Sequence, residues 1–177
     1  MRARTLVVAA LLLVGLCLPA RMGVPGWTRV VLADAGSGRV IASGLLRDGE
    51  EVVLTWTNSL FGQFVTETLV ASSGSLVLTR VTFTDPCDPH EMRAAPAELN
   101  DLYHTGGAFS VQGLSRPVTR VVFLVGEIGR PKARVGHRTV DFEAEVGFGG
   151  RVLLTAGKPS LYQRLISGFP GVSRWPR

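Results

Sequence analysis

Apolar and polar residues alternate with a period of two along most of the chain after residue 27, and this pattern predicts a β protein. Short breaks rich in Gly, Ser and Asp separate the alternating stretches. The expected strands lie at 28–34, 38–46, 51–59, 63–72, 75–84, 108–113, 119–126 and 150–156, with a further hairpin over 132–146. We therefore expect an all-β fold, a mostly antiparallel β-sandwich or open barrel of about nine to ten short strands.

A Pro-rich connection interrupts the strands between residues 85 and 107. Within it, one or two helical turns are predicted from 96 to 103. Pro96 suits a first helical position, and Gly106 and Gly107 suit the end of a helix. The fold is thus expected to carry one or two short helices.

Two tight turns, at Phe61-Gly62 and at Ser73-Gly74, suggest a specific strand register. If each is a two-residue turn, Trp56 lies opposite Glu67 and Glu67 lies opposite Arg80, on one face of the sheet. The carboxylate would then bond the guanidinium, and Asn58 would reach the second carboxylate oxygen. Two interpretations stay open at this point: an ion pair that fixes the register, or a polar contact point for a ligand or partner.

The N-terminus has the composition of an export signal or a short membrane anchor. A basic "MRAR" precedes an apolar stretch from Thr5 to Ala20, and Arg2 and Arg4 favour a cytoplasmic N-terminus. We expect residues 1–22 to be a signal peptide or anchor, residues 27–167 a single β domain, and residues 168–177 a flexible tail. The domain is then extracytoplasmic: periplasmic, or at the outer side of the cytoplasmic membrane.

Composition and charge further restrict the class of protein. With 46% hydrophobic and 19% charged residues, the chain is typical of a globular domain with a core. The net charge of +5 is spread along the chain without a basic cluster that alternates with aromatics, which argues against a nucleic-acid partner. Only Cys87 would remain after removal of a signal containing Cys17, so the domain must be stable without an internal disulfide. No cofactor is predicted.

Three groups of residues are candidates for chemistry. Ser59 follows Asn58, whose amide cannot act as a base, so a serine hydrolase is disfavoured. The loop "DPCDPHE" contains metal-ligand types at a spacing that matches no standard site, and a solvated loop is the preferred interpretation. Its weak metal candidates are Asp85, Cys87, Asp88, His90 and Glu91. His137, at a hairpin bend, is retained as a candidate contact residue.

The stretches "TWTNSL" and "VTET", with the later "VGHRTV", resemble the domain-of-unknown-function family 1850. Its members are small exported or anchored bacterial and archaeal proteins, often encoded beside TRAP transporters of the TAXI type. The family's His-Ser pair and downstream Glu match Asn58, Ser59 and Glu67 here, with Asn replacing His. The resemblance implies an envelope protein that works near a transporter.

These observations together predict a non-enzymatic extracytoplasmic binding or accessory protein. Its expected partner is a membrane transporter or the transporter's substrate-binding protein, and its N-terminal segment brings it close to the membrane. The expected contact residues are Trp56, Asn58, Ser59, Glu67, Arg80 and His137. The alternatives are a zinc-dependent or serine hydrolase and a structural envelope protein without a ligand.

Overall fold

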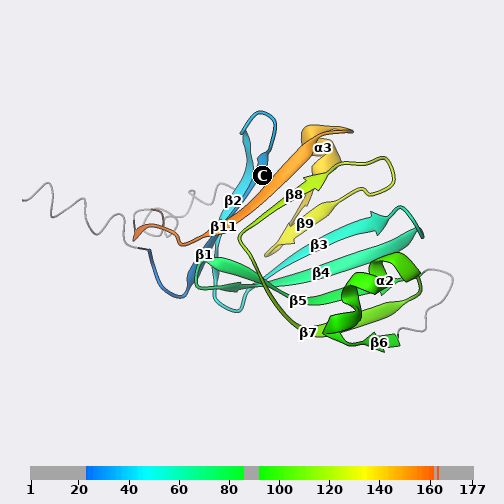
Figure 1. Ribbon diagram of the computed structural model, residues 1–177. Coiled ribbons are helices and arrows are strands. Elements are labelled where there is room, and N and C mark those ends of the chain that lie inside the picture. Colours follow the sequence, from blue (N-terminus) through cyan, green and yellow to red (C-terminus); the bar gives the residue numbers. More distant parts are fainter. Residues whose placement is uncertain (1–22, 86–91, 162, 164–177) are drawn as a thin grey trace, which may run out of the picture.

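The computed structural model describes residues 23–85, 92–161 and 163, and within them eleven strands form two sheets (Figure 1). The smaller sheet has four strands in the order β2-β1-β11-β8. Its members are β1 (Trp27–Asp34), β2 (Val40–Arg47), β8 (Arg120–Leu124) and β11 (Arg151–Gly157). All of its neighbouring strands are antiparallel.

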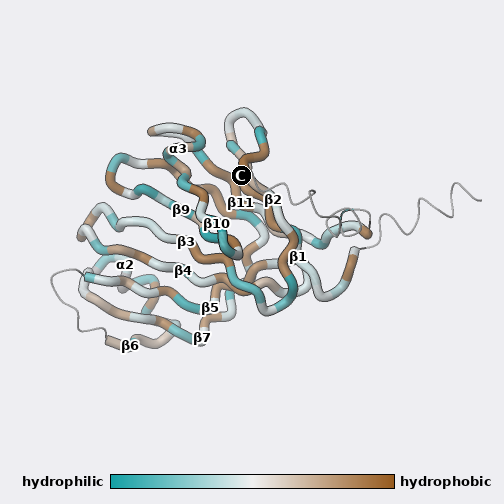
Figure 2. The backbone as a smooth tube through the Cα atoms, turned by 180° about the vertical axis from the view of Figure 1, so that it is seen from behind, coloured by the Kyte–Doolittle hydropathy of each residue, from teal (hydrophilic) through white to brown (hydrophobic). Residues whose placement is uncertain are grey.

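The larger sheet has seven strands in the order β10-β9-β3-β4-β5-β7-β6, and Figure 2 shows it from behind. Only β6 runs parallel to its neighbour among the described strands. The members of this sheet are β3 (Glu51–Asn58), β4 (Gln63–Ser72), β5 (Ser75–Thr84), β6 (Met92–Ala94), β7 (Phe109–Val118), β9 (Lys132–Val135) and β10 (Arg138–Asp141). The predicted all-β, sandwich-like architecture is confirmed.

Short helical pieces complete the described fold. A 3-10 turn over Pro96–Glu98 runs into α2 (Leu99–Thr105), which confirms the helix expected after Pro96. The other piece, α3 (Phe142–Val146), begins at Asp141, whose Oδ1 accepts hydrogen bonds from the backbone N–H groups of Glu143 and Ala144. No helix among the described residues is long and apolar enough to cross a membrane. The predicted signal or anchor at 1–22 and the tail at 168–177 lie outside the described residues.

The larger sheet contributes side chains to two separate hydrophobic cores. One half packs against the four-stranded sheet, through buried residues such as Leu32, Leu54 and Leu154. The other half extends beyond the small sheet and is covered by α2, with Phe83 and Phe109 among its buried residues. Burial of these apolar side chains is the main favourable term for the fold, at about 25 cal/mol per Å² removed from water.

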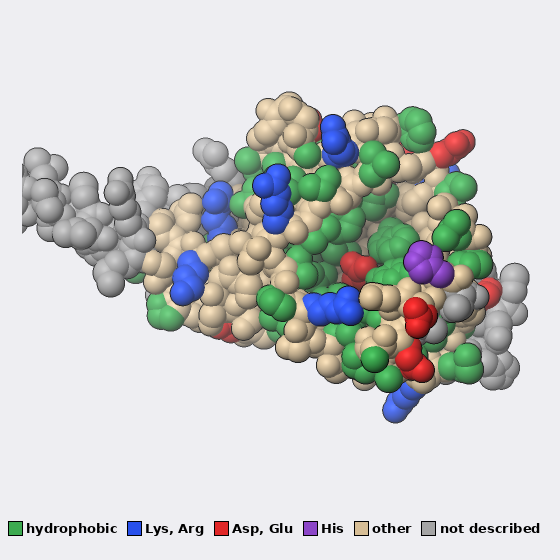
Figure 3. Space-filling view, in the orientation of Figure 1, with side chains coloured by type: hydrophobic (Ala, Val, Ile, Leu, Met, Phe, Trp, Pro, Cys, Tyr) green, Lys and Arg blue, Asp and Glu red, His purple; other side chains and the backbone are tan. Residues whose placement is uncertain are grey.

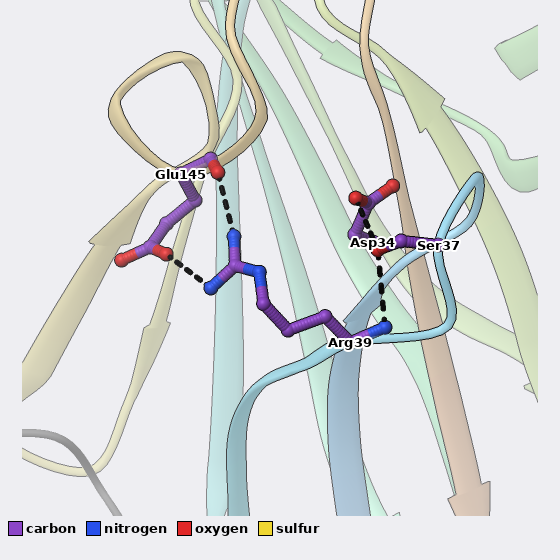
Figure 4. A network of polar contacts seen from close by, with 4 residues as sticks. All are labelled: Asp34, Ser37, Arg39 and Glu145. Atoms are coloured by element: carbon purple, nitrogen blue, oxygen red, sulfur yellow. Dashed lines mark hydrogen bonds and ion pairs between the residues drawn. The ribbon is translucent and has the colours of Figure 1, made fainter.

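The β1–β2 hairpin is tied to α3 by polar contacts at its tip (Figure 4). Asp34 Oδ2 accepts a 2.6 Å hydrogen bond from the Ser37 hydroxyl, and this bond and the one from the Gly36 N–H lower the pKa of Asp34. Arg39 Nη2 donates to the Glu145 carbonyl at 2.7 Å, and Arg39 Nη1 lies 3.5 Å from the Glu145 carboxylate. The bonds therefore link an edge of the small sheet to the connection between β10 and β11.

Candidate functional site

The turn at Ser73-Gly74 is the predicted two-residue turn. Ser73 has φ 47° and Gly74 has φ 93°, and such positive angles at both central residues define the turn type that suits a right-handed strand twist. The pairs Leu69–Leu78 and Val70–Val77 follow from it. The predicted register of this hairpin is confirmed as far as Leu69.

Beyond Leu69 a β-bulge changes the register. Thr68 pairs with Arg80 and Glu67 pairs with Val81, so Thr79 is an extra residue in β5. The Thr79 hydroxyl donates to the Thr68 carbonyl at 3.1 Å. The bulge turns Arg80 to the opposite face of the sheet, where it is exposed. The predicted Glu67–Arg80 pair is therefore wrong.

The first hairpin also differs from the prediction. Its loop is Ser59–Gly62 rather than Phe61-Gly62 alone, because Asn58 Oδ1 accepts a 3.0 Å hydrogen bond from the Leu60 N–H. Trp56 consequently pairs with Val65, and Glu67 pairs with Leu54. A shift of two residues preserves the face of each side chain, so Trp56 and Glu67 are diagonal neighbours on one face.

Glu67 lies at the boundary between the two cores. On β4, Val65 belongs to the core beneath α2 and Leu69 to the core between the sheets. Glu67 stands between them, half-buried, where neither α2 nor the four-stranded sheet fully covers the larger sheet. This position explains why a strand facing the core carries a carboxylate.

Two aromatic side chains hold the Glu67 carboxylate. The Tyr103 hydroxyl, from α2, donates to Glu67 Oε1 at 3.2 Å, and the Trp56 side chain also stabilises the charged carboxylate. The Trp56 and Tyr103 rings are nearly parallel, at 12° with centroids 6.2 Å apart, and Phe83 meets Tyr103 edge-on at 5.0 Å. Glu67, Trp56 and Tyr103 form the candidate site, which we call the Glu67 site.

Burial controls the ionisation of these groups. Loss of water raises the pKa of the Glu67 carboxyl, and the hydrogen bond from Tyr103 and the Trp56 side chain oppose this shift by stabilising the charged form. Burial raises the pKa of the Tyr103 phenol as well, and the neighbouring Glu67 charge adds to that rise. Tyr103 therefore stays a hydrogen-bond donor at neutral pH.

The Glu67 site opens to the surface. Figure 3 shows a hollow between the four-stranded sheet and α2, with apolar walls, an acidic side chain at its floor and a basic one at its rim. Arg116, on β7, is exposed and pairs with Leu78, a residue that packs against both cores. The Arg116 charge offsets part of the rise in the pKa of Tyr103. A carboxylate can accept about four hydrogen bonds. The site therefore suits a group that donates hydrogen bonds and carries an apolar part against the rings.

The structure does not gather the other predicted contact residues at the Glu67 site. Asn58 is buried and holds its own turn, and Ser59 is exposed in that turn. His137 is exposed in the β9–β10 turn, beyond the Val52–Val135 pair and thus towards the other end of β3. Of the weak metal candidates, Cys87, Asp88, His90 and Glu91 lie outside the described residues. The described residues hold no group of three or more His, Cys, Asp or Glu that could bind a metal.

Tyr103 is the site residue that the sequence analysis did not select. The sequence feature that indicates Tyr103 is its helical spacing from Leu99, because this spacing places both side chains on one face of α2. Leu99 is buried in the core beneath α2, and Tyr103 packs against that core. The buried Gln63 amide fixes the end of the same helix by donating from Nε2 to the Gly107 carbonyl.

No family model, no curated protein and no solved structure matches this chain. The resemblance to the domain-of-unknown-function family 1850 therefore stays a prediction.

The raised pKa of Glu67 makes a prediction about stability. The pKa of the Glu67 carboxyl in the folded protein lies above its ordinary value of 4.5. The stabilisation from this shift is complete when the pH is below 4.5, and it is lost as the pH rises through the folded pKa. Glu67→Gln cannot titrate. We expect the free energy of unfolding of the wild type, relative to Glu67→Gln, to fall as the pH rises above about 4.5. Urea unfolding of both proteins over a pH series measures this difference, and a difference that rises with pH would contradict the assigned burial.

Proposed function

We propose that this protein is a non-enzymatic, extracytoplasmic binding or accessory protein that works with a membrane transporter, and that the Glu67 site is its contact point. The observation that carries the proposal is a half-buried carboxylate between the two cores, bonded by the Tyr103 hydroxyl and flanked by the Trp56 side chain. Natural cores keep such groups only when hydrogen bonds or a function compensate for the lost hydration.

Three further arguments support this assignment. The basic "MRAR" and the apolar stretch Thr5–Ala20 fit a signal peptide or an anchor, and hence a periplasmic domain or one at the outer side of the cytoplasmic membrane. The resemblance to the domain-of-unknown-function family 1850 favours the neighbourhood of a TAXI-type transporter. The antiparallel sheets provide a rigid frame, and rigid elements position a binding site more precisely than loops do.

The site geometry defines the contacted group. Trp56 and Tyr103 offer apolar ring surface, and Glu67 offers hydrogen-bond acceptors, so the transporter or its substrate-binding protein would present a donor group beside an apolar side chain. Buried aromatic anchors of this kind dominate the energy of many interfaces. Arg80, which the bulge turns to the opposite face, takes no part in this contact.

The proposal is tested by crosslinking in native membranes, with the full-length tagged chain expressed in the organism that encodes it. We expect a transporter subunit or its substrate-binding protein, identified by mass spectrometry, to be captured by the wild type. Glu67→Ala and Trp56→Ala should each reduce that capture at least about tenfold, the loss that corresponds to about 1.4 kcal/mol of binding.

The matched control is Arg80→Ala, which removes a charged side chain from the same hairpin on the other face. It should leave capture unchanged. Equal capture by wild type and Glu67→Ala, or loss of capture in Arg80→Ala alone, would exclude the Glu67 site as the contact point.

A further inference from the structure

The outward face of the four-stranded sheet differs in character from the Glu67 site. On β1, Thr28, Val30 and Leu32 point into the core, so the alternate residues Trp27, Arg29, Val31 and Ala33 point outward. The strand pairing extends the same alternation to the other three strands. The outward side chains of the other strands are Val40, Ser43, Leu45 and Arg47 on β2, Arg151, Leu153 and Thr155 on β11, and Arg120, Val122 and Leu124 on β8.

An apolar row crosses this face. Val40, Ala33, Leu153 and Val122 lie abreast through the pairs Ala33–Val40, Ala33–Leu153 and Leu153–Val122. Val40 is 55% exposed and Val122 is 48% exposed, and Leu124 beside them is 65% exposed. Apolar side chains gathered on one exposed face mark a surface that contacts something other than water.

The charges on the same face are all positive. Arg29, Arg47, Arg120 and Arg151 stand on it, and none of its outward positions is acidic. Arg47 lies over the Trp27 ring, with Cζ 5.2 Å from the ring centroid. Figure 3 shows basic and apolar side chains interspersed over this sheet. The face therefore combines apolar area with uniformly basic charge.

The acidic residues in neighbouring turns accept hydrogen bonds from the protein itself, and Glu50 accepts one from the Arg47 backbone N–H. Asp34 accepts hydrogen bonds from Ser37 and Gly36, and Asp48 accepts them from the backbone and hydroxyl of Ser73. Among the described residues, the ion pairs are Arg39–Glu145 and Lys132–Asp141, and neither involves any of the four arginines of this face. Their positive charge is thus available to a partner.

We propose that this face rests on the surface of an anionic phospholipid bilayer. Each Lys or Arg near an anionic surface is attracted to it, and arginine stems can lie along apolar surface while their guanidinium groups reach the phosphates. Trp is enriched at the level of lipid headgroups, which suits Trp27. Val40, Val122 and Leu124 would enter the interface between headgroups and acyl chains.

The length of the N-terminal chain supports a bilayer over a protein as the occupant. The apolar stretch that we expect to enter the membrane ends at Ala20, and β1 begins at Trp27, so residues 21–26 connect them. Six residues extend at most about 20 Å, at roughly 3.3–3.6 Å each. An anchored chain would therefore hold β1 within that distance of the bilayer. This inference concerns a different face from the Glu67 site and does not depend on the proposed transporter contact.

Site-directed spin labelling of the full-length chain in vesicles tests the inference. In a Cys17→Ser, Cys87→Ser background, one nitroxide is placed at Val122→Cys and, in a second protein, at Phe64→Cys. Phe64 is the matched control because it is also 48% exposed but lies on the outward face of the other sheet. Accessibility to oxygen, which concentrates in bilayers, is compared with accessibility to a water-soluble nickel chelate.

In vesicles that contain phosphatidylglycerol, we expect the oxygen-to-nickel accessibility ratio at Val122→Cys to exceed that at Phe64→Cys several-fold. The ratio should fall to the control value in vesicles of phosphatidylcholine alone. It should also fall in about 1 M salt, because the Debye length is then only about 3 Å. The combined substitution of Arg29→Gln, Arg120→Gln and Arg151→Gln should have the same effect. Equal ratios at both positions in anionic vesicles would overturn the proposal. Protection of Val122→Cys from both reagents would also overturn it, since that result identifies a protein as the occupant.

Discussion

Phe83→Ala is expected to lower the free energy of unfolding by about 3–5 kcal/mol, the range typical of a fully buried phenylalanine. Phe83 is fully buried in the core beneath α2, where its ring lies 4.4 Å from that of Phe109 and 5.0 Å from that of Tyr103. Its loss leaves a cavity directly under the helix that supplies Tyr103. We therefore expect the contact between Tyr103 and Glu67 to loosen as well.

Chemical unfolding followed by circular dichroism measures this loss, and the emission of Trp56 in a Trp27→Phe, Trp175→Phe background reports on the Glu67 site. The matched control is Phe64→Ala on the paired strand, because the Phe64 side chain is 48% exposed and points away from both cores. That substitution should change stability by about 0.5 kcal/mol or less. Similar losses from both substitutions would show that α2 does not cover a core of its own.

Gly74→Ala is expected to lower the free energy of unfolding by more than the conformational strain of its turn alone. Gly74 has φ 93°, a conformation that costs a residue with a side chain about 1–2 kcal/mol. A Cβ at this position would also clash with Lys158 Cγ and lie 2.9 Å from the Lys158 backbone nitrogen. The Lys158 side chain can move, but the backbone of the segment after β11 cannot do so freely. We therefore expect Gly74→Ala to lower the free energy of unfolding by about 2–4 kcal/mol in total.

Gly49 provides an unusually close control for this substitution. It has the same φ of 93°, but a Cβ there would meet no atom within 4 Å. Gly49→Ala should therefore show the conformational cost alone, about 1–2 kcal/mol. Thermal or urea unfolding of the two variants in parallel gives the cost of the contact with Lys158 as their difference. A difference near zero would mean that the Lys158 segment does not pack against the Ser73-Gly74 turn.

Strict alternation was enough to predict the fold class, and the positions of Pro and Gly predicted the short helix after Pro96 and the turn at Ser73-Gly74. It failed where the period of two is interrupted. Thr79 adds one residue to β5, and such a bulge has no apolar–polar signature because both Arg80 and Val81 suit a strand. One extra residue was sufficient to move Arg80 to the wrong face in the prediction.

The Glu67 site was predicted in part for a related reason. The face shared by Trp56 and Glu67 survived the mistaken loop length, since a shift of two residues leaves sidedness unchanged. The partner of Glu67 comes instead from α2, which is distant in sequence: Tyr103 is 36 residues away. Local strand pairing cannot reveal such a contact, because it depends on how the helix packs against the sheet.

The two ends of the described sandwich meet at one place. Gly23 forms an antiparallel bridge with Ser160, and the Val24 N–H donates to the Pro159 carbonyl at 3.0 Å. Two segments this close can be joined by a short linker without disturbing either sheet. The exposed Ser59–Gly62 loop then offers a place for new ends, which makes this sandwich a natural scaffold for circular permutation.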